Sequence, residues 1–261
     1  MKLIDKIYKS LVDNFIVWLI PFLILVIWQI VVQNGWLSSR VMPAPLDVIS
    51  AGFTLTANGE LIHHFLISLQ RAILGLLIGG SIGFILGFIT GLSRLAENLL
   101  DSTIQMIRTI PLLALVPLVI LWFGIGEFSK IFLLSLAVFF PIYLNTFHGL
   151  RSVDKDLIEM GRVYGLTPYG LFKNVILPGA MPYILVGLRM SLGFMWLYLI
   201  VAETIASSAG IGYMTMNARE FLQTDIMVLG ILLYAVLGKI SDVLASILEK
   251  RYLKWHKGYQ K

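Results

Sequence analysis

Arg151–Pro178 reads RSVDKDLIEMGRVYGLTPYGLFKNVILP and is a polar stretch between long apolar stretches. Unpaired backbone polar groups in hydrocarbon cost several kcal/mol each, so a polar stretch of this length between membrane spans must lie in water. Its residues predict two short helices, the first capped by Asp154 and the second by Thr167. Gly165 suits the left-handed position that ends the first helix, and Pro178 is expected to end the second.

The composition of the chain indicates an all-α integral membrane protein. Of its 261 residues, 58% are hydrophobic and 13% are charged, and the mean hydropathy is +0.86. Charged residues make up about a quarter of a soluble domain. We expect a single transmembrane domain over 1–261, and no disulfide or cysteine metal site because the chain has no Cys. The net charge of +5 reports membrane topology here, so no nucleic-acid partner is predicted. No metal site is predicted either.

The apolar stretches predict six membrane-spanning helices, each long enough to cross a bilayer. They lie at about 15–33, 65–92, 99–123, 130–150, 181–204 and 226–248. The first is expected to be retained, because no small-residue cleavage site of a signal peptide follows it. Pro111 and Pro117 lie inside the third span and predict a kink there.

Five glycines recur every four residues along the second predicted span. Small residues at this spacing let another helix approach closely, so we interpret them as a packing ridge, with direct substrate contact as the alternative. The five are Gly75, Gly79, Gly83, Gly87 and Gly91.

The distribution of Lys and Arg predicts the orientation of the chain. If both termini are cytoplasmic, thirteen Lys and Arg residues fall in inner segments. The outer segments and their edges then hold four, which are Arg40, Arg71, Lys130 and Arg219. Basic residues accumulate on the cytoplasmic side, so residues 151–178 are expected to face the cytoplasm.

Charged residues within the predicted spans are candidates for function, because each costs about 2.5–3.5 kcal/mol at mid-bilayer and must face protein or water. They are Arg108, Arg189, Glu203, Lys239 and Asp242. Lys239 and Asp242 are three residues apart and could pair. We hypothesise that Arg108 lines the translocation path and helps an anion pass; an interhelical salt bridge or a snorkelling arginine is the alternative. Glu203 and Asn145 are further candidates for this path.

The sequence contains no ATP site and no constellation typical of a catalyst. Gly238–Lys239 is superficially like a P-loop, but Leu233 replaces the first glycine and Ile240 the Ser or Thr. A transporter driven by ATP would therefore need a separate ATPase subunit. His63 and His64 have no third ligand at metal spacing and are expected to be solvated at the membrane edge.

The spacing within the polar stretch resembles the EAA loop of ABC importer permeases, E-A-A, three residues, G, nine residues, I-x-L-P. Glu159, Gly165, Leu177 and Pro178 are in register with it. The departures are Met160 and Gly161 in place of two alanines and Val175 in place of isoleucine. An ordinary amphipathic cytoplasmic loop is the alternative.

Further segments resemble the permeases of the nitrate, sulfonate, taurine and bicarbonate group, and most of all the aliphatic sulfonate permeases. They include 121–127, 139–146, 186–189, 201–204, 210–214, 216–225 and 254–256.

This resemblance implies a type I ABC importer permease fold in the bacterial inner membrane, with alternating access and a role in sulfur assimilation. The implied assembly is a permease homodimer, two ATPase subunits that bind ATP and Mg, and an extracytoplasmic binding protein. The permease itself would bind no cofactor.

The resemblance also implies that the EAA loop docks on the ATPase, with Glu159, Gly165, Leu177 and Pro178 as its coupling residues. Arg162, Tyr164 and Thr167 lie beside them and are predicted to belong to the same contact. Taurine, nitrate or another small solute remain alternative substrates. A channel or ion-coupled carrier without ATPase is the competing class, and a membrane enzyme has little support.

Overall fold

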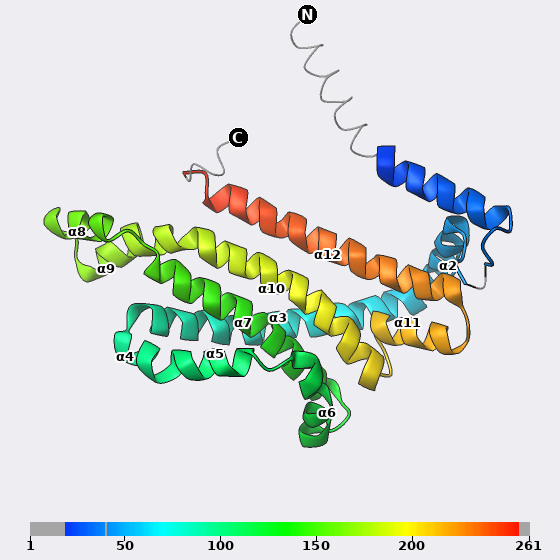
Figure 1. Cartoon of the computed structure of the whole chain (residues 1–261), viewed down its shortest axis with the longest axis horizontal. Coiled ribbons are helices and arrows are strands. Elements are labelled where there is room, and N and C mark those ends of the chain that lie inside the picture. Colours follow the sequence, from blue (N-terminus) through cyan, green and yellow to red (C-terminus); the bar gives the residue numbers. More distant parts are fainter. Residues whose placement is uncertain (1–18, 40, 256–261) are drawn as a thin grey trace, which may run out of the picture. The chain divides into compact units, whose positions relative to one another are not determined.

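The computed structural model describes residues 19–39 and 41–255, and within these residues it contains helices and no strand (Figure 1). The start of the predicted first span and parts of both basic chain ends lie outside the described residues. The chain divides into two compact units, 1–62 with 214–232 and 63–213 with 233–261. Helices pass from one unit into the other, and the expected single domain over 1–261 stays a prediction.

The first unit contains the apolar helix Leu19–Gln33 and α2 (Pro45–Ala57). Gln29 joins them, because its Oε1 accepts a hydrogen bond from the Leu46 backbone N–H at 3.1 Å. Asp47 lies in the first turn of α2 and accepts from the Ala44 N–H at 3.2 Å. This capping interaction fixes the start of α2 at Pro45, which suits the first helical position because it needs no N–H donor.

The second unit holds most of the long helices. Over both units, the remaining helices in chain order are α3 (Glu60–Leu92), α4 (Arg94–Ala96), α5 (Ser102–Arg108), α6 (Leu112–Phe123), α7 (Glu127–Arg151), α8 (Lys155–Val163), α9 (Pro168–Leu171), α10 (Leu177–Ala206), α11 (Ile211–Glu220) and α12 (Thr224–Tyr252). Most of α11 and the start of α12 belong to the first unit. Two π-helical turns, Glu97–Asp101 and Phe172–Ile176, link α4 to α5 and α9 to α10.

The glycine ridge of α3 lies directly against the backbone of α7. A Cβ on Gly79 would lie 2.0 Å from the Ser135 carbonyl oxygen, and one on Gly83 would lie 2.6 Å from that of Phe139. At the two ends of the ridge, Gly75 faces Leu134 and Gly91 faces Leu150. Partner numbers rise together along both helices, so α3 and α7 run parallel. Only glycine permits this backbone approach.

The other neighbours of α7 and α10 fix the remaining chain directions in this unit. Gly149 of α7 faces Ala180 and Tyr183 of α10, so α7 and α10 are antiparallel. On α10 and α12, Arg189 contacts Asp242 at one end and Glu203 contacts Tyr234 at the other. These two helices are therefore antiparallel as well. These directions agree with the order expected for spans two, four, five and six.

The structure confirms the fold class but not the count of six spanning helices. Four helices are long and apolar enough to cross a membrane: α3, α7, the continuous helix Pro168–Ile205 and α12. The first predicted span is described only as the shorter apolar helix Leu19–Gln33.

In the predicted third span, 99–123, the chain is broken rather than kinked, and the two helices together are apolar enough to count as a fifth, broken span. Arg94–Arg108 and Leu112–Phe123 are separate pieces bent by 97° at the break between them (Figure 1). Pro111 has no N–H and takes an extended conformation, with ψ of 117°, as the N-cap of α6. Pro117 remains inside α6.

The end predicted for the second loop helix at Pro178 is wrong. Pro178 lies in the first turn of α10, and Pro168–Ile205 forms one helix of 38 residues. The π-helical turn before it contains the bond from the Leu177 N–H to the Phe172 carbonyl, five residues back. We attribute the continuity to this wider turn, which accommodates a proline that lacks its own N–H.

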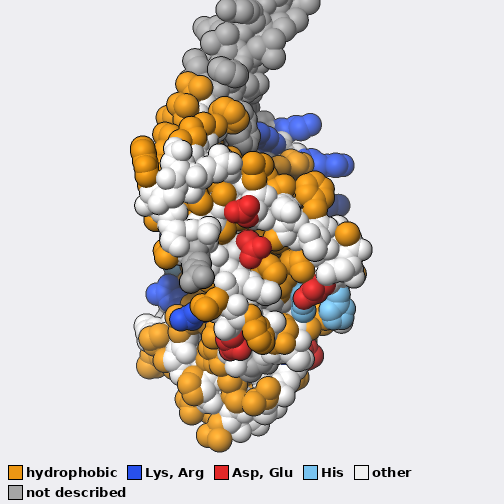
Figure 2. Space-filling view, turned by 90° about the vertical axis from the view of Figure 1, so that its right-hand side faces the viewer, with side chains coloured by type: hydrophobic (Ala, Val, Ile, Leu, Met, Phe, Trp, Pro, Cys, Tyr) orange, Lys and Arg blue, Asp and Glu red, His pale blue; other side chains and the backbone are white. Residues whose placement is uncertain are grey.

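Large apolar side chains remain exposed over much of the surface. Figure 2 shows hydrophobic side chains spread over one face, with charged side chains in small groups. Ile20, Phe53 and Leu121 are 67%, 74% and 77% exposed. Exposed apolar area on this scale is expected for helices that face lipid or partner proteins.

Candidate functional site

The loop 151–178 folds as a helical hairpin with its predicted caps in place. Asp154 accepts from the Asp156 N–H at 2.9 Å and begins α8, and Thr167 accepts from the Gly170 N–H at 3.1 Å and begins α9. Gly165 has φ of +78°. Its N–H bonds to the Arg162 carbonyl at 2.9 Å, which satisfies one of the last carbonyls of α8.

The predicted coupling residues are distributed along this hairpin. Glu159 and Arg162 are exposed on α8, Tyr164 and Gly165 form the turn, and Thr167 caps α9. Leu177 and Pro178 lie farther along, at the start of α10, and are half-buried.

The outer surface of the hairpin is unexpectedly apolar for a segment that must lie in water. Val163, Tyr164 and Tyr169 are 86%, 80% and 71% exposed. A cluster of exposed large apolar side chains marks an interaction surface. The hairpin therefore carries the features of a docking element.

A pocket of about 390 Å³ lies at the broken span and contains two of the predicted path residues, Arg108 and Asn145. The end of α5 and the start of α6 form one wall, and α7 and α10 form the other. Asn145 donates to the Pro141 carbonyl at 2.8 Å and points its amide towards the Met190 sulfur at 3.9 Å. Arg108 is exposed, and it forms no hydrogen bond or ion pair with any residue that the structure describes.

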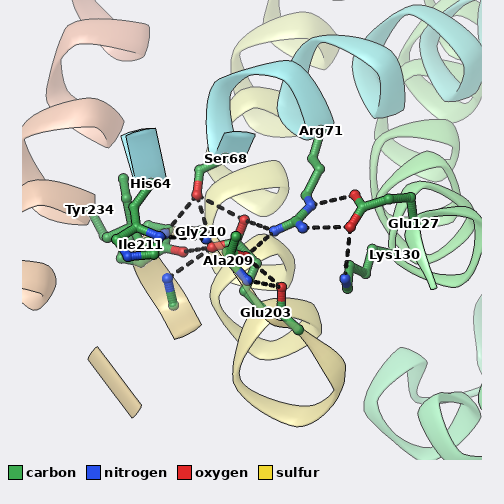
Figure 3. Close-up of polar contacts among 12 residues, drawn as sticks. His64, Ser68, Arg71, Glu127, Lys130, Glu203, Ala209, Gly210, Ile211 and Tyr234 are labelled. Carbon is green, nitrogen blue, oxygen red and sulfur yellow. Dashed lines mark hydrogen bonds and ion pairs between the residues drawn. The ribbon is translucent and has the colours of Figure 1, made fainter. Parts of the chain in front are cut away.

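Glu203, the third predicted path residue, does not line this pocket. It is fully buried in a polar network near the end of α10 (Figure 3). Its carboxylate accepts hydrogen bonds from Ser68 Oγ at 2.8 Å and from the Gly212 N–H at 2.8 Å. Arg71 Nη1 donates at 2.7 Å and the Tyr234 hydroxyl at 3.0 Å. A buried carboxylate with this many donors is satisfied internally.

Arg71 connects the network to two further segments of the second unit. It is 3% exposed, and its Nε and Nη2 both donate to the Glu127 carboxylate at 2.6 Å (Figure 3). Its Nη1 also donates to the Ala209 carbonyl at 2.6 Å. Lys130 adds an ion pair to Glu127 at 2.9 Å. The network thus joins α3, the start of α7, the end of α10 and the segment after α10.

Two glycines provide the space for the buried carboxylate. Gly210 has φ of +117°, and a Cβ there would lie 2.4 Å from the Glu203 carboxylate. A Cβ on Gly212 would lie 2.7 Å from the Glu203 Cβ. The Gly210 N–H also donates to Nδ1 of His64, which is 7% exposed. The expectation of a solvated His64 is therefore wrong, whereas His63 is exposed.

Sequence reasoning missed this network because its members lie far apart in the chain. In the sequence, Arg71 and Lys130 stand out only as basic residues at the edges of outer segments. The closely spaced Gly210 and Gly212 were the available signal, because a pair of glycines indicates close approach of another group. The spacing does not reveal that the group is a carboxylate.

Three further charged residues of the spans, Arg189, Lys239 and Asp242, lie together beside the middle of α10. Arg189 Nε donates to Asp242 at 2.6 Å and Nη1 donates to Glu249 at 3.3 Å. The predicted pair of Lys239 and Asp242 is confirmed, with the atoms 3.7 Å apart. Arg189 is nevertheless the closer partner of Asp242, from a different helix.

These features define a multi-pass helical membrane protein with an exposed, partly apolar hairpin at one end of its long helices. Residues 79–254 match the family of binding-protein-dependent transport system inner membrane components, and the chain belongs to that family. It is therefore the membrane subunit of a binding-protein-dependent transporter, an ABC permease.

Several named relatives align with nearly the full chain. The putative aliphatic sulfonates transport permease protein SsuC of Escherichia coli K12 is 57% identical, over 93% of this chain and 92% of that protein. The protein of the same name from Bacillus subtilis 168 is 46% identical, over 93% and 88%. The taurine transport system permease protein TauC of Escherichia coli K12 is 35% identical, over 89% and 86%.

A solved structure shares the fold. A chain from the crystal structure of an amino acid ABC transporter with histidines matches with a TM-score of 0.59 and 20% identity. The match covers 76% of this chain and 96% of that chain.

Proposed function

We propose that this chain is the permease of an ATP-driven importer for aliphatic sulfonates. Two copies would together enclose the translocation path, which would open to one side of the membrane at a time. An extracytoplasmic binding protein would deliver the substrate. Two separate ATPase subunits would bind ATP and Mg, and the permease itself would catalyse no reaction. The identity of 57% over 93% of the chain with a putative sulfonate permease supports this substrate class.

The single structural observation that carries the coupling mechanism is the continuity between the hairpin and the span. The loop helix that begins at Pro168 continues to Ile205 without a break. A displacement of the hairpin would therefore be transmitted along this continuous helix to the membrane span. The exposed apolar residues around Val163 and Tyr164 provide the surface on which an ATPase would dock.

The proposed orientation places the hairpin in the cytoplasm. The Arg71–Glu203 network lies at the end of α10 opposite the hairpin and would then be extracytoplasmic. Arg71 and Lys130 are among the four basic residues of the outer segments, and both are neutralised by Glu127 or Glu203.

Reconstitution tests the proposal directly. The permease and its ATPase are reconstituted in proteoliposomes with the ATPase facing the lumen, and the binding protein is added outside. Uptake of radiolabelled alkanesulfonates, taurine and nitrate is then measured with and without ATP in the lumen. We expect ATP-dependent uptake of alkanesulfonates above that of taurine and nitrate. Preferential uptake of taurine or nitrate would contradict the substrate class. Uptake that needs an ion gradient and no ATPase would contradict the transporter class.

A further inference from the structure

Arg108 is the one arginine or lysine of the predicted spans that has no oppositely charged partner among the described residues. Arg189, Glu203, Lys239 and Asp242 all have an oppositely charged partner. Arg108 has none among the described residues. An arginine side chain stays protonated, and a charge within a span must face water, a protein partner or a ligand. The pocket at Arg108 therefore presents a free guanidinium to whatever enters it.

The broken span adds a second source of positive potential at the same place. Residues 108–112 all line the pocket, and α6 begins there with Leu112. Its N-cap is Pro111, which offers no side-chain hydrogen bond to the first turn. The first N–H groups of a helix have no intrahelical acceptor and attract anions. Broken membrane helices of transporters bind ions at such ends.

The opposite wall of the pocket is mostly apolar, with Asn145 and Tyr198 as its polar members. Phe140 and Leu144 of α7 and Phe194 of α10 are among the residues that line it. The amide nitrogen of Asn145 is already engaged by the Pro141 carbonyl. A volume of about 390 Å³ is within the range of small-molecule sites. A cationic wall facing an apolar wall fits a small organic anion with a short aliphatic chain.

We propose that this pocket is a substrate site within the permease, in which Arg108 holds the charged head of an alkanesulfonate and the wall of α7 and α10 holds its chain. This inference rests on the proposed function in sulfonate import and adds a selectivity step after the binding protein. A guanidinium donates two parallel hydrogen bonds to an oxyanion, and the aliphatic chain gains free energy by leaving water.

The test uses the complete importer in proteoliposomes and measures two quantities, alkanesulfonate uptake and ATPase activity stimulated by the loaded binding protein. In Arg108→Gln we expect uptake to fall by roughly ten- to hundredfold, the range for loss of a charge-assisted hydrogen bond, while ATPase stimulation persists. Arg108→Lys keeps the charge and should be intermediate. Arg94→Gln removes an exposed arginine outside the pocket and should leave both quantities unchanged. Unchanged uptake in Arg108→Gln, or equal loss of uptake and ATPase stimulation in both Arg108 variants, would overturn the proposal.

A second variant tests the apolar wall through selectivity. Phe194→Trp fills part of the pocket, so we expect the ratio of short-chain to long-chain sulfonate uptake to rise by roughly tenfold. A difference of one or two methylenes changes discrimination by an apolar pocket on this scale. An unchanged ratio would overturn the assignment of this wall. A wild-type importer that takes up no sulfonate overturns the proposed function and the site together. If the wild type takes up sulfonates and the Arg108 and Phe194 variants behave as the wild type does, only the proposed site is overturned.

Discussion

At the scale of single residues, the molecule combines buried charges with the small residues that make room for them. Glu203 is fully buried yet accepts from a hydroxyl, a guanidinium, a backbone N–H and a phenol. Gly210 and Gly212 leave the volume that the carboxylate occupies. Burying an ion pair is costly, and it becomes tolerable when each lone pair and proton has a partner. Loss of Arg71 would leave the buried Glu203 carboxylate without its cation, whereas loss of the Glu203 charge leaves Arg71 paired with Glu127.

Removal of Arg71 is therefore expected to destabilise the protein more than removal of the Glu203 charge. Arg71→Met leaves a buried carboxylate without its cation, at a cost of about 3–5 kcal/mol. Glu203→Gln leaves Arg71 with Glu127 and should cost less. The double variant should be more stable than Arg71→Met alone, because the uncompensated charge is gone. Midpoints of thermal unfolding in detergent, followed by tryptophan fluorescence, measure all three.

Lys239→Met is the matched control for this series. The Lys239 side chain is 75% exposed and its Nζ lies 3.7 Å from the Asp242 carboxylate, so loss of this solvent-screened pair should change stability little. If the double variant unfolds no later than Arg71→Met, the two residues are not coupled and the account of the network is wrong.

Gly165 matters through its backbone conformation alone. A side chain there would meet nothing within 4 Å, but φ is +78°. Proline fixes φ near −65° and removes the N–H that bonds to the Arg162 carbonyl. We expect Gly165→Pro to reduce uptake roughly tenfold, as a ~1.4 kcal/mol penalty on the coupled state would, and to weaken co-purification with the ATPase.

Gly165→Asn separates conformation from side-chain bulk. Asparagine tolerates the left-handed region, so this variant should keep most of the uptake. An undiminished complex with normal uptake in Gly165→Pro would show that the turn has no role in coupling.

At the scale of elements, α3 and α10 each depend on a local departure from an ordinary helix. α3 carries five glycines that allow contact with the α7 backbone. α10 contains Pro178 in its first turn, next to a π-helical turn that keeps it continuous with the hairpin. The glycines bring α3 and α7 together, and the π-helical turn keeps the helix continuous through Pro178.

Gly83→Ala should separate α3 from α7. The new Cβ would lie 2.6 Å from the Phe139 carbonyl oxygen, and a backbone atom cannot move aside as a side chain can. We expect destabilisation of about 1–3 kcal/mol, the usual cost of overpacking, measured as a lower thermal unfolding midpoint.

Gly238→Ala is the control, because a Cβ there would meet nothing within 4 Å among the described residues of this chain. This substitution should be neutral or slightly stabilising, since alanine favours helix over glycine. Equal midpoints for the two variants would contradict the packing role of the ridge.

At the scale of the whole molecule, the second unit has two chemically different ends. The hairpin lies at one end of α7 and α10, and the network of Arg71, Glu127 and Glu203 lies at the other. The parallel α3 and α7, and the antiparallel α7 and α10, place these ends on opposite sides of the membrane. Motion at the hairpin must therefore travel the length of the spans to affect the far end.

The orientation can be read with single cysteines, because the chain contains no cysteine of its own. Tyr164 in the hairpin is 80% exposed, and Ile125 at the other end is 78% exposed. With the permease expressed without its ATPase, we expect a membrane-impermeant maleimide to modify Tyr164→Cys only in inside-out vesicles. Ile125→Cys should react only in intact spheroplasts. The reverse pattern would refute the cytoplasmic hairpin.

Local features were predictable from the sequence because they depend on residues a few positions apart. The caps at Asp154 and Thr167, the left-handed Gly165 and the glycine ridge follow from backbone preferences and side-chain size. The positions of most apolar spans follow from the length of hydrocarbon to be crossed. The family could likewise be proposed from Glu159, Gly165 and their spacing.

Only the tertiary structure decided which distant groups meet. Arg71 and Glu203 are 132 residues apart, and no local preference of either one selects the other. The prolines predict a kink in this segment, but the angle of 97° and the position of the break, at Pro111 and not at Pro117, appear only in the folded chain. Pairing of charges and opening of the pocket are set by the folded geometry, because the free energy of a buried charge depends on everything that surrounds it.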